Sequence, residues 1–238
     1  MIKEALQYIV GMGAPNINEI KGETYSDKEL FRVSHNPKAV PVKMATLKSL
    51  VDYIKSGTDT MEGRMLIHVT SPVQVKFYSQ LDNDRGREYM AEVNAELPHF
   101  CFDSFMSHEK FIIGMQSVFL PGEDRELVLK FAGTVEGGTV ASYGDDGISQ
   151  KAVVKTGVAS KSEALVPNPV RLKPYRTFTE VEQPEISFIF RMDECEKEGL
   201  QCALFEADGG AWKLEAMNNI KEYLERELEG MEQFIVIA

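Results

Sequence analysis

The chain has 238 residues, a formal net charge of −11 at neutral pH, and 43% apolar residues. This composition is typical of a globular protein, and the length allows a sizeable core in one large domain or two small ones. The acidic balance argues against a general coat for double-stranded DNA, because phosphate binding needs clustered cations. The sequence has no uninterrupted apolar run of about 18 residues, so we expect no transmembrane helix.

The cysteines and the N-terminus indicate the cellular compartment. Cys101, Cys195 and Cys202 are odd in number and lack the C-x-x-C spacing of a zinc knuckle, so neither a disulfide framework nor a zinc site is expected. Glu4 and Gln7 interrupt the apolar run at the N-terminus, which argues against a secretory signal. We therefore expect a protein of the reducing cytoplasm.

Hydrophobic periodicity and turn residues predict the elements of the first half of the chain. Helices are expected over 2–10 and 46–55, with a strand pair within 17–33 and strands over 65–70, 73–81 and 88–95. Thr46 is the expected N-cap of the second helix and Gly57 its stop. The last two strands flank a short polar turn and predict a hairpin.

The second half is predicted in the same way. We expect helices over 107–120, 123–133 and 211–229, and strands over 139–143, 148–156, 187–192, 201–205 and 234–237. Ser107 is the expected cap of the first of these helices. The buried stripe of the last helix is expected to contain Leu214, Met217, Ile220, Leu224 and Leu228.

This order of elements predicts the fold class. Strands follow strands and helices follow helices more often than they alternate, which favours an α+β fold with antiparallel hairpins over a doubly wound sheet. We expect one compact domain over 1–238, with 1–60 set apart as an N-terminal subregion.

Positive charge gathers in one part of this acidic chain. Residues 147–178 contain six basic side chains and one acidic one, whereas the segments before and after it are both net negative. Such asymmetry is more informative than the total charge and indicates an anion-holding surface.

The segment Val166–Pro184, VPNPVRLKPYRTFTEVEQP, holds four prolines and three of these cations. Proline cannot donate to a strand ladder, so the segment is not a central strand throughout. On an extended backbone Arg171, Lys173 and Tyr175 project to one side, and Leu172 and Arg176 to the other.

These side chains suit a small anionic ligand. Arginine binds phosphate with two parallel hydrogen bonds and stacks on rings. Exposed N–H groups at the start of the last helix, beside two glycines, are a further place where an anion could dock. The expected ligand-binding residues are Lys151, Lys155, Arg171, Lys173, Tyr175, Arg176, Gly209 and Gly210. The opposing interpretation is that these cations pair with Glu180, Glu182 and Glu185, or with the acidic last helix of a second subunit.

Two carboxylates, Glu206 and Asp208, fall on one side of an extended segment and are followed by Lys213. This arrangement is compatible with a metal-dependent hydrolase. The competing interpretation is that Asp208 caps the last helix and Glu206 is solvated. His99 and Cys101 can meet on one face of an extended segment, but the sequence supplies no third ligand beside them. We therefore predict no metal, no cofactor and no catalytic residue.

Three motifs carry a resemblance to a known family. They are DDGISQ at Asp145–Gln150, the whole of Val166–Pro184, and ALFEADGGAWKLEA at Ala203–Ala216. Together with the segment Phe111–Gly114, they resemble the YfdQ-like family of phage and prophage proteins. The resemblance covers 65–238 and implies a phage-encoded protein that works inside a bacterial cell. It implies no catalytic residues, and nothing is carried over to the first 60 residues.

Three functions remain open at this point. The first is a non-enzymatic, homo-oligomeric binder of a small nucleotide-like anion, for example one that sequesters a nucleotide signal of host defence. The second is a single-stranded nucleic-acid-binding module of phage replication or recombination, built on a cationic groove and stacking rings. The third is the hydrolase that uses Glu206 and Asp208. A homo-oligomer is expected because Phe234–Ile237 would leave a bare, apolar strand edge.

Overall fold

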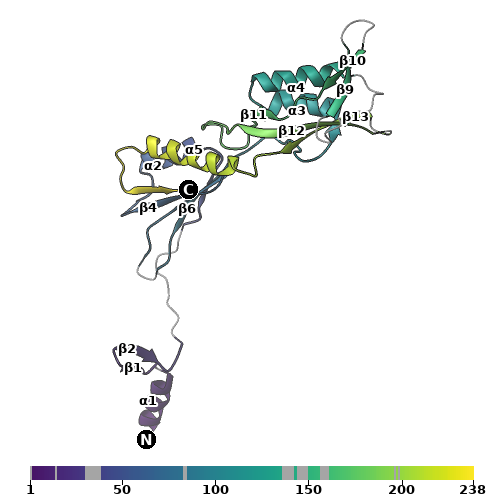
Figure 1. Cartoon of the computed structure of the whole chain (residues 1–238). Helices are drawn as coiled ribbons and strands as arrows, with labels where there is room; N and C mark the ends of the chain where they lie inside the picture. The colour runs from purple at the N-terminus through teal and green to yellow at the C-terminus, as the bar shows by residue number, and fades with distance from the viewer. Residues whose placement is uncertain are drawn as a thin grey trace. The chain divides into compact units, whose positions relative to one another are not determined.

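The computed structural model describes residues 2–13, 15–29, 39–82, 85–135, 142–143, 150–155, 161–195, 197 and 199–238, with the backbone alone for the strands between 142 and 165. The chain divides into two compact units, Met1–Lys38 and Ala39–Ala238. Sequence analysis expected one compact domain, and the observed boundary falls inside the subregion 1–60 that it set apart. The class is α+β, as predicted (Figure 1).

The first unit contains a helix and a hairpin. Helix α1 spans Ile2–Gly13, and strands β1 (Ile17–Ile20) and β2 (Glu23–Ser26) pair antiparallel. The helix was expected over 2–10, but it continues through Gly11 and ends at Gly13. Asn16 donates its backbone N–H and its amide to the Asp27 carboxylate, both at 2.7 Å, and these bonds lower the pKa of Asp27.

The second unit is built on two main sheets. The first sheet has the order β14-β4-β5-β6-β3, and the second has the order β11-β12-β13-β7. The strands of the first sheet are β3 (Val42–Met44), β4 (Met65–Ser71), β5 (Gln74–Tyr78), β6 (Tyr89–Asn94) and β14 (Phe234–Ile237). Those of the second are β7 (Met106–Ser107), β11 (Val170–Leu172), β12 (Ile186–Cys195) and β13 (Gly199–Glu206).

A third, smaller sheet has the order β10-β9-β8. Its strands are β8 (Ser142–Tyr143), β9 (Gln150–Lys155) and β10 (Lys161–Leu165). Strands were predicted over 139–143 and 148–156, and β8 and β9 lie there and pair antiparallel, whereas β10 was not predicted. The GDDG turn predicted between them lies outside the described residues.

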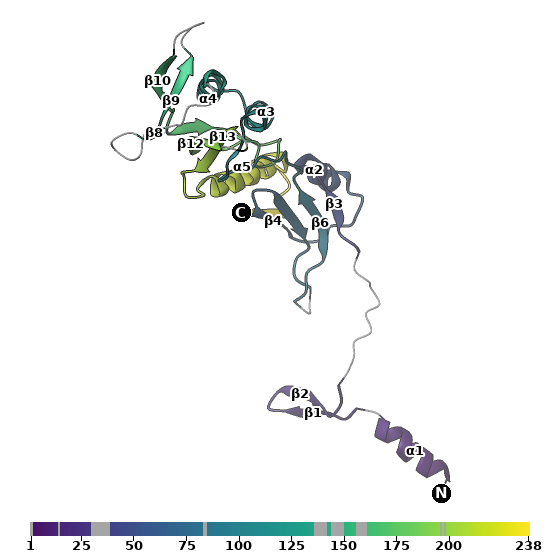
Figure 2. The ribbon, with the colours of Figure 1, turned by 90° about the vertical axis from the view of Figure 1, so that its right-hand side faces the viewer.

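Helices α2 (Leu47–Ser56) and α5 (Trp212–Glu227) cover one face of the first sheet (Figures 1 and 2). The alternation of β5 places Val75 and Phe77 on that face, fully buried, as predicted. The predicted cap of α2 is also confirmed, because the Thr46 side chain accepts the Ser49 N–H at 3.2 Å and Gly57 ends the helix with φ +61°.

Helices α3 (His108–Val118) and α4 (Glu123–Thr134) pack on the second sheet with a separate core. Ser107 is the N-cap residue of α3, as predicted, but its side chain makes no capping hydrogen bond. The reason is that Ser107 belongs to β7, where it pairs with Gln201 of β13. Phe111, Met115 and Val118 lie at helical spacing along α3 and are buried.

Helix α5 contributes to both cores. Trp212 and Ala216 belong to the core of the second sheet, whereas Ile220, Leu224 and Leu228 belong to that of the first. Leu214 was expected in this stripe but is 64% exposed. The true stripe steps by four residues from Trp212, and a residue two positions further along a helix lies on the opposite side.

The segment Val166–Pro184 crosses between the same two cores. Val170 and Leu172 are buried beside the second sheet, whereas Phe178 is buried beside the first. The Thr177 hydroxyl donates to the carbonyl oxygen of Pro72 at 2.6 Å, which fixes the far end of the crossing. The proline-rich segment therefore connects the two sheets. Only β11 in it is a strand, which agrees with the prediction that the prolines prevent a strand throughout.

Candidate ligand-binding site

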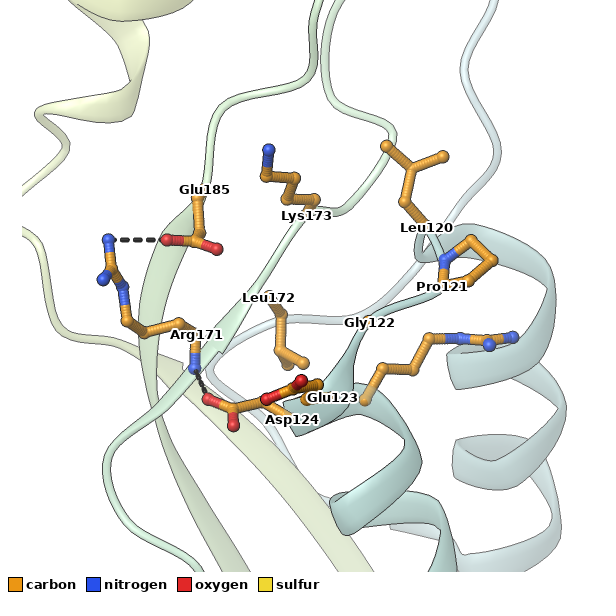
Figure 3. Close-up of a pocket in the computed structure, with 10 residues that line it drawn as sticks. Leu120, Pro121, Gly122, Glu123, Asp124, Arg171, Leu172, Lys173 and Glu185 are labelled. Carbon is orange, nitrogen blue, oxygen red and sulfur yellow. Dashed lines mark hydrogen bonds and ion pairs between the residues drawn. The ribbon is translucent and has the colours of Figure 1, made fainter.

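The N-terminus of α4 meets strand β11 at a polar pocket of about 430 Å³. Figure 3 shows its walls. The helix contributes Gly122, Glu123 and Asp124, and the segment after β11 contributes Lys173. The two elements are joined by a hydrogen bond from the Arg171 backbone N–H to Asp124 Oδ2, 2.6 Å long.

Two of the predicted ligand-binding residues, Arg171 and Lys173, line this pocket. Leu172 between them is buried, so the predicted alternation is confirmed for 171–173. The pocket also contains Arg125, which sequence analysis missed. Its guanidinium is committed to the end of α3, where it donates to the carbonyl oxygens of Met115 (2.8 Å) and Gln116 (3.0 Å).

Arg171 and Lys173 are each paired with a carboxylate of the chain itself. Arg171 Nη2 lies 2.5 Å from Glu185 Oε2 (Figure 3), and Lys173 Nζ lies 2.9 Å from Glu182 Oε1. The bond to Glu182 raises the pKa of Lys173. The opposing interpretation of the sequence, pairing with Glu182 and Glu185, is therefore confirmed for these two residues. Glu180, the third carboxylate of that interpretation, instead accepts the backbone N–H of Lys48 at 3.3 Å.

Of the other predicted residues, Tyr175 does not line the pocket. Tyr175 is half-buried and donates its backbone N–H to Val118 at 2.8 Å. The backbones of Lys151 and Lys155 lie in β9, but their side chains lie outside the described residues.

Arg176 belongs to a separate cluster with Phe102, Glu206 and Trp212, the first residue of α5. Its guanidinium carbon lies 4.1 Å from the centre of the Phe102 ring and 4.3 Å from that of the Trp212 ring. It also pairs with Glu206, at 2.5 Å, and both partners are largely buried, with 17% and 23% of their side chains exposed. Cation–π contact and a shielded ion pair make this a structural cluster.

Glu206 and Asp208 are engaged within the protein. Glu206 accepts the indole N–H of Trp212 at 3.3 Å, in addition to its pair with Arg176, so the expectation that it is solvated is wrong. Asp208 accepts the backbone N–H groups of Gly210 (3.0 Å) and Trp212 (3.1 Å), so its side chain caps the first N–H of α5 as predicted, although the N-cap residue itself is Ala211. The positive φ angles of Gly209 and Gly210, +65° and +83°, allow this tight entry.

Among the described residues, no group of three or more His, Cys, Asp and Glu side chains could hold a metal ion. No helix in that part of the chain has both the length and the apolar character needed to cross a bilayer. Comparison of the chain with family models, curated proteins and solved structures gives no match.

Proposed function

We propose that this chain is a non-enzymatic binding protein whose pocket between α4 and β11 takes a small, anionic, nucleotide-like ligand. The observation that supports it is the position of Arg171 and Lys173, two cations singled out from the sequence, on the wall of one polar pocket. The resemblance of the chain to YfdQ-like proteins supports a role as a phage or prophage accessory protein inside a bacterial cell. Sequestering a nucleotide signal of host defence is a task that fits such a pocket.

The ion pairs at this pocket are compatible with ligand exchange. Arg171 and Glu185 have 68% and 37% of their side chains exposed, and Lys173 and Glu182 have 37% and 75%. Exposed pairs of this kind contribute about 0–1 kcal/mol each. A phosphate group offers more charge and a bidentate geometry to the same guanidinium, so it can displace a carboxylate at little cost.

The mixed charge of the walls favours a nucleotide over a bare phosphate. Glu123 and Asp124 stand in the same pocket as the cations. A ligand that is anionic at one end and carries N–H donors at the other satisfies both kinds of group. Nucleotides with amino-bearing bases have both ends, whereas inorganic phosphate has the anionic groups without the N–H donors.

The test is a calorimetric titration of the purified chain with adenine and guanine nucleotides, linear and cyclic, and with inorganic phosphate. We expect binding of at least one nucleotide, at least tenfold weaker binding by Arg171→Ala, and unchanged binding by Lys221→Ala. Lys221 is a matched control because it is a surface cation paired with Glu225 on α5, at 3.8 Å. Absence of binding to every nucleotide, or equal affinity of the Arg171 and Lys221 variants, would contradict the proposal.

A second candidate, single-strand nucleic-acid binding, is favoured by the other face of the first sheet. Tyr78 and Tyr89 stack there with ring centres 5.1 Å apart, and Lys76 Nζ lies 5.9 Å from the Tyr89 ring. Neither α2 nor α5 covers this face, because both pack on the opposite one (Figure 1). Stacked rings beside a cation are the equipment of single-strand binding.

This candidate is tested by gel retardation of single-stranded oligonucleotides at several salt concentrations. It predicts salt-sensitive retardation that Tyr78→Ala weakens and Arg171→Ala leaves unchanged. Retardation that depends on Arg171 instead would assign nucleic-acid binding to the α4–β11 pocket, and no retardation at low salt would end the candidate.

A further inference from the structure

Phe100 anchors an extended segment beside helix α3. Its ring is 8% exposed and lies 5.0 Å from the ring of Phe119 and 6.2 Å from that of Phe111, centre to centre. Gly114 gives it room, since a Cβ at that position would lie 2.7 Å from the Phe100 ring. The backbone around Phe100 is therefore fixed by the core.

The two neighbours of Phe100 point away from this core and meet each other. Alternation along an extended backbone places residues 99 and 101 on the same side. The Cys101 thiol lies 3.7 Å from Nε2 of His99, within hydrogen-bond reach for sulfur. Sequence analysis considered this pair as metal ligands, but the described residues supply no third ligand. A thiol beside an imidazole is also the arrangement of an activated nucleophile.

The pair opens onto a pocket of about 710 Å³. Phe105 and Ile113 line it and are 41% and 58% exposed, so the pocket offers apolar surface to a ligand. Lys110 lines it as well and supplies a positive charge. The pocket thus combines a nucleophile, a base, an apolar wall and a cation.

We propose that Cys101 and His99 form a nucleophilic site that accepts an acyl group from a small acyl thioester. The Cys101 sulfur attacks the thioester carbonyl carbon while its proton passes to His99 Nε2. The bond between that carbon and the sulfur of the donor then breaks, and the departing thiolate takes the proton from His99. The products are an S-acylated Cys101 and the free donor thiol, and the acyl chain lies against Phe105 and Ile113.

The other cysteines serve as internal references. Cys202 is fully buried in β13, and burial raises the pKa of its thiol to about 12, which keeps it unreactive. Cys195, at the end of β12, is partly exposed. Cys195 therefore reports the reactivity of an accessible thiol of the same folded chain.

The test uses the full chain and two simple donors, the acetyl and octanoyl thioesters of N-acetylcysteamine. Peptide mass spectrometry measures the rate of acylation at each cysteine at fixed pH. We expect Cys101 to react at least tenfold faster than Cys195, and the octanoyl donor to react faster than the acetyl donor. The variant His99→Gln should lose at least tenfold in rate at Cys101, since general-base assistance is worth about 10²–10⁴. Its melting temperature should be unchanged, because His99 does not pack in the core.

Equal acylation of Cys101 and Cys195, or an unchanged rate in a folded His99→Gln variant, would overturn the proposal. An acetyl donor that matches the octanoyl donor would overturn the apolar acyl site. The variant Ile113→Ser gives an independent check, because it alters the exposed wall of the pocket and should slow only the octanoyl donor. This site shares no lining residue with the α4–β11 pocket, and its acylation is one transfer per chain without turnover, so it is compatible with a non-enzymatic binding role and neither proposal depends on the other.

Discussion

Each cation of the segment Val166–Pro184 forms its own ion pair, which the charge pattern of the sequence does not show by itself. Arg171, Lys173 and Arg176 have three different carboxylate partners, namely Glu185, Glu182 and Glu206. The first two pairs are near in sequence and were predicted. The third joins residues 30 positions apart, and nothing local in the sequence indicates it, because it depends on how β13 and α5 meet the crossing segment.

Asp208 gives a direct test at this scale. Replacing it with alanine removes the acceptor of two N–H groups at the start of α5, so we expect a loss of about 1–2 kcal/mol in the free energy of unfolding. Urea denaturation measures this loss, and Glu215→Ala, on the exposed first turn of α5, is the control. A divalent-dependent hydrolysis that Asp208→Ala abolishes without loss of stability would instead revive the hydrolase interpretation.

At the scale of elements, the bend after β11 is organised by one buried amide. Gln183 Oε1 accepts the backbone N–H groups of Arg176 (3.0 Å) and Thr177 (3.2 Å), and its Nε2 donates to the carbonyl oxygen of Phe178 at 2.9 Å. Gln183 is 3% exposed. The Gln183 amide thus provides hydrogen-bond partners for backbone groups of a turn. Its burial could not be predicted from the sequence, because glutamine is usually exposed.

We therefore expect Gln183→Leu to destabilise the chain by about 2–4 kcal/mol, because it leaves buried backbone donors and an acceptor without partners. The control is Gln116→Leu, at an exposed position of α3, which should change stability by less than about 0.5 kcal/mol. Chemical denaturation followed by circular dichroism measures both. Similar stabilities for the two variants would show that the bend does not depend on Gln183.

Most elements of the second unit could be predicted because their signals are local. The alternation of β5, the Thr46 cap and the Gly57 stop all lie within a few residues of the element they define. The side-chain cap at Ser107 and the burial of Leu214 were predicted wrongly because tertiary contacts decide both. Ser107 is held by pairing with β13, and the face of α5 is set by Trp212 in the second core.

At the scale of the whole molecule, the partition into two cores could not be predicted. It depends on α5 and on the crossing segment, each of which contributes apolar residues to both cores. The parallel pairs β14–β4 and β3–β6 are likewise long-range and leave no periodic signal. Strand β14 lies at an edge of its sheet, with Ile235 and Ile237 each 41% exposed. A homo-oligomer formed through this edge stays a prediction.

The free energy of unfolding at alkaline pH depends on two shielded groups, the Cys202 thiol and the Tyr53 hydroxyl. Burial raises the pKa of Cys202 from 9.0 to about 12, and burial with a hydrogen bond to Asp59 raises that of Tyr53 from 10.0 to about 12. In both cases the unfolded chain loses its proton first. The free energy of unfolding is therefore unaffected by these groups below about pH 9 and falls as the pH rises towards 12.

The expected slope for Cys202 is at most roughly 1.4 kcal/mol per pH unit. Urea denaturation at pH 8, 9, 10 and 11 measures it, and Cys202→Ala should flatten the curve between pH 9 and 11. The same slope in both proteins would show that this thiol is not shielded in the folded state.

The central claim of the proposed function is that the Glu185 carboxylate compensates the charge of the Arg171 guanidinium until an anionic ligand takes its place, and the variant Glu185→Gln tests it most directly. Calorimetric titration of the nucleotide that binds best should show severalfold tighter binding by Glu185→Gln than by the unaltered chain. The gain should shrink as salt is raised, because the freed charge at Arg171 is exposed to screening. Weaker or unchanged binding by this variant at low salt would contradict the account.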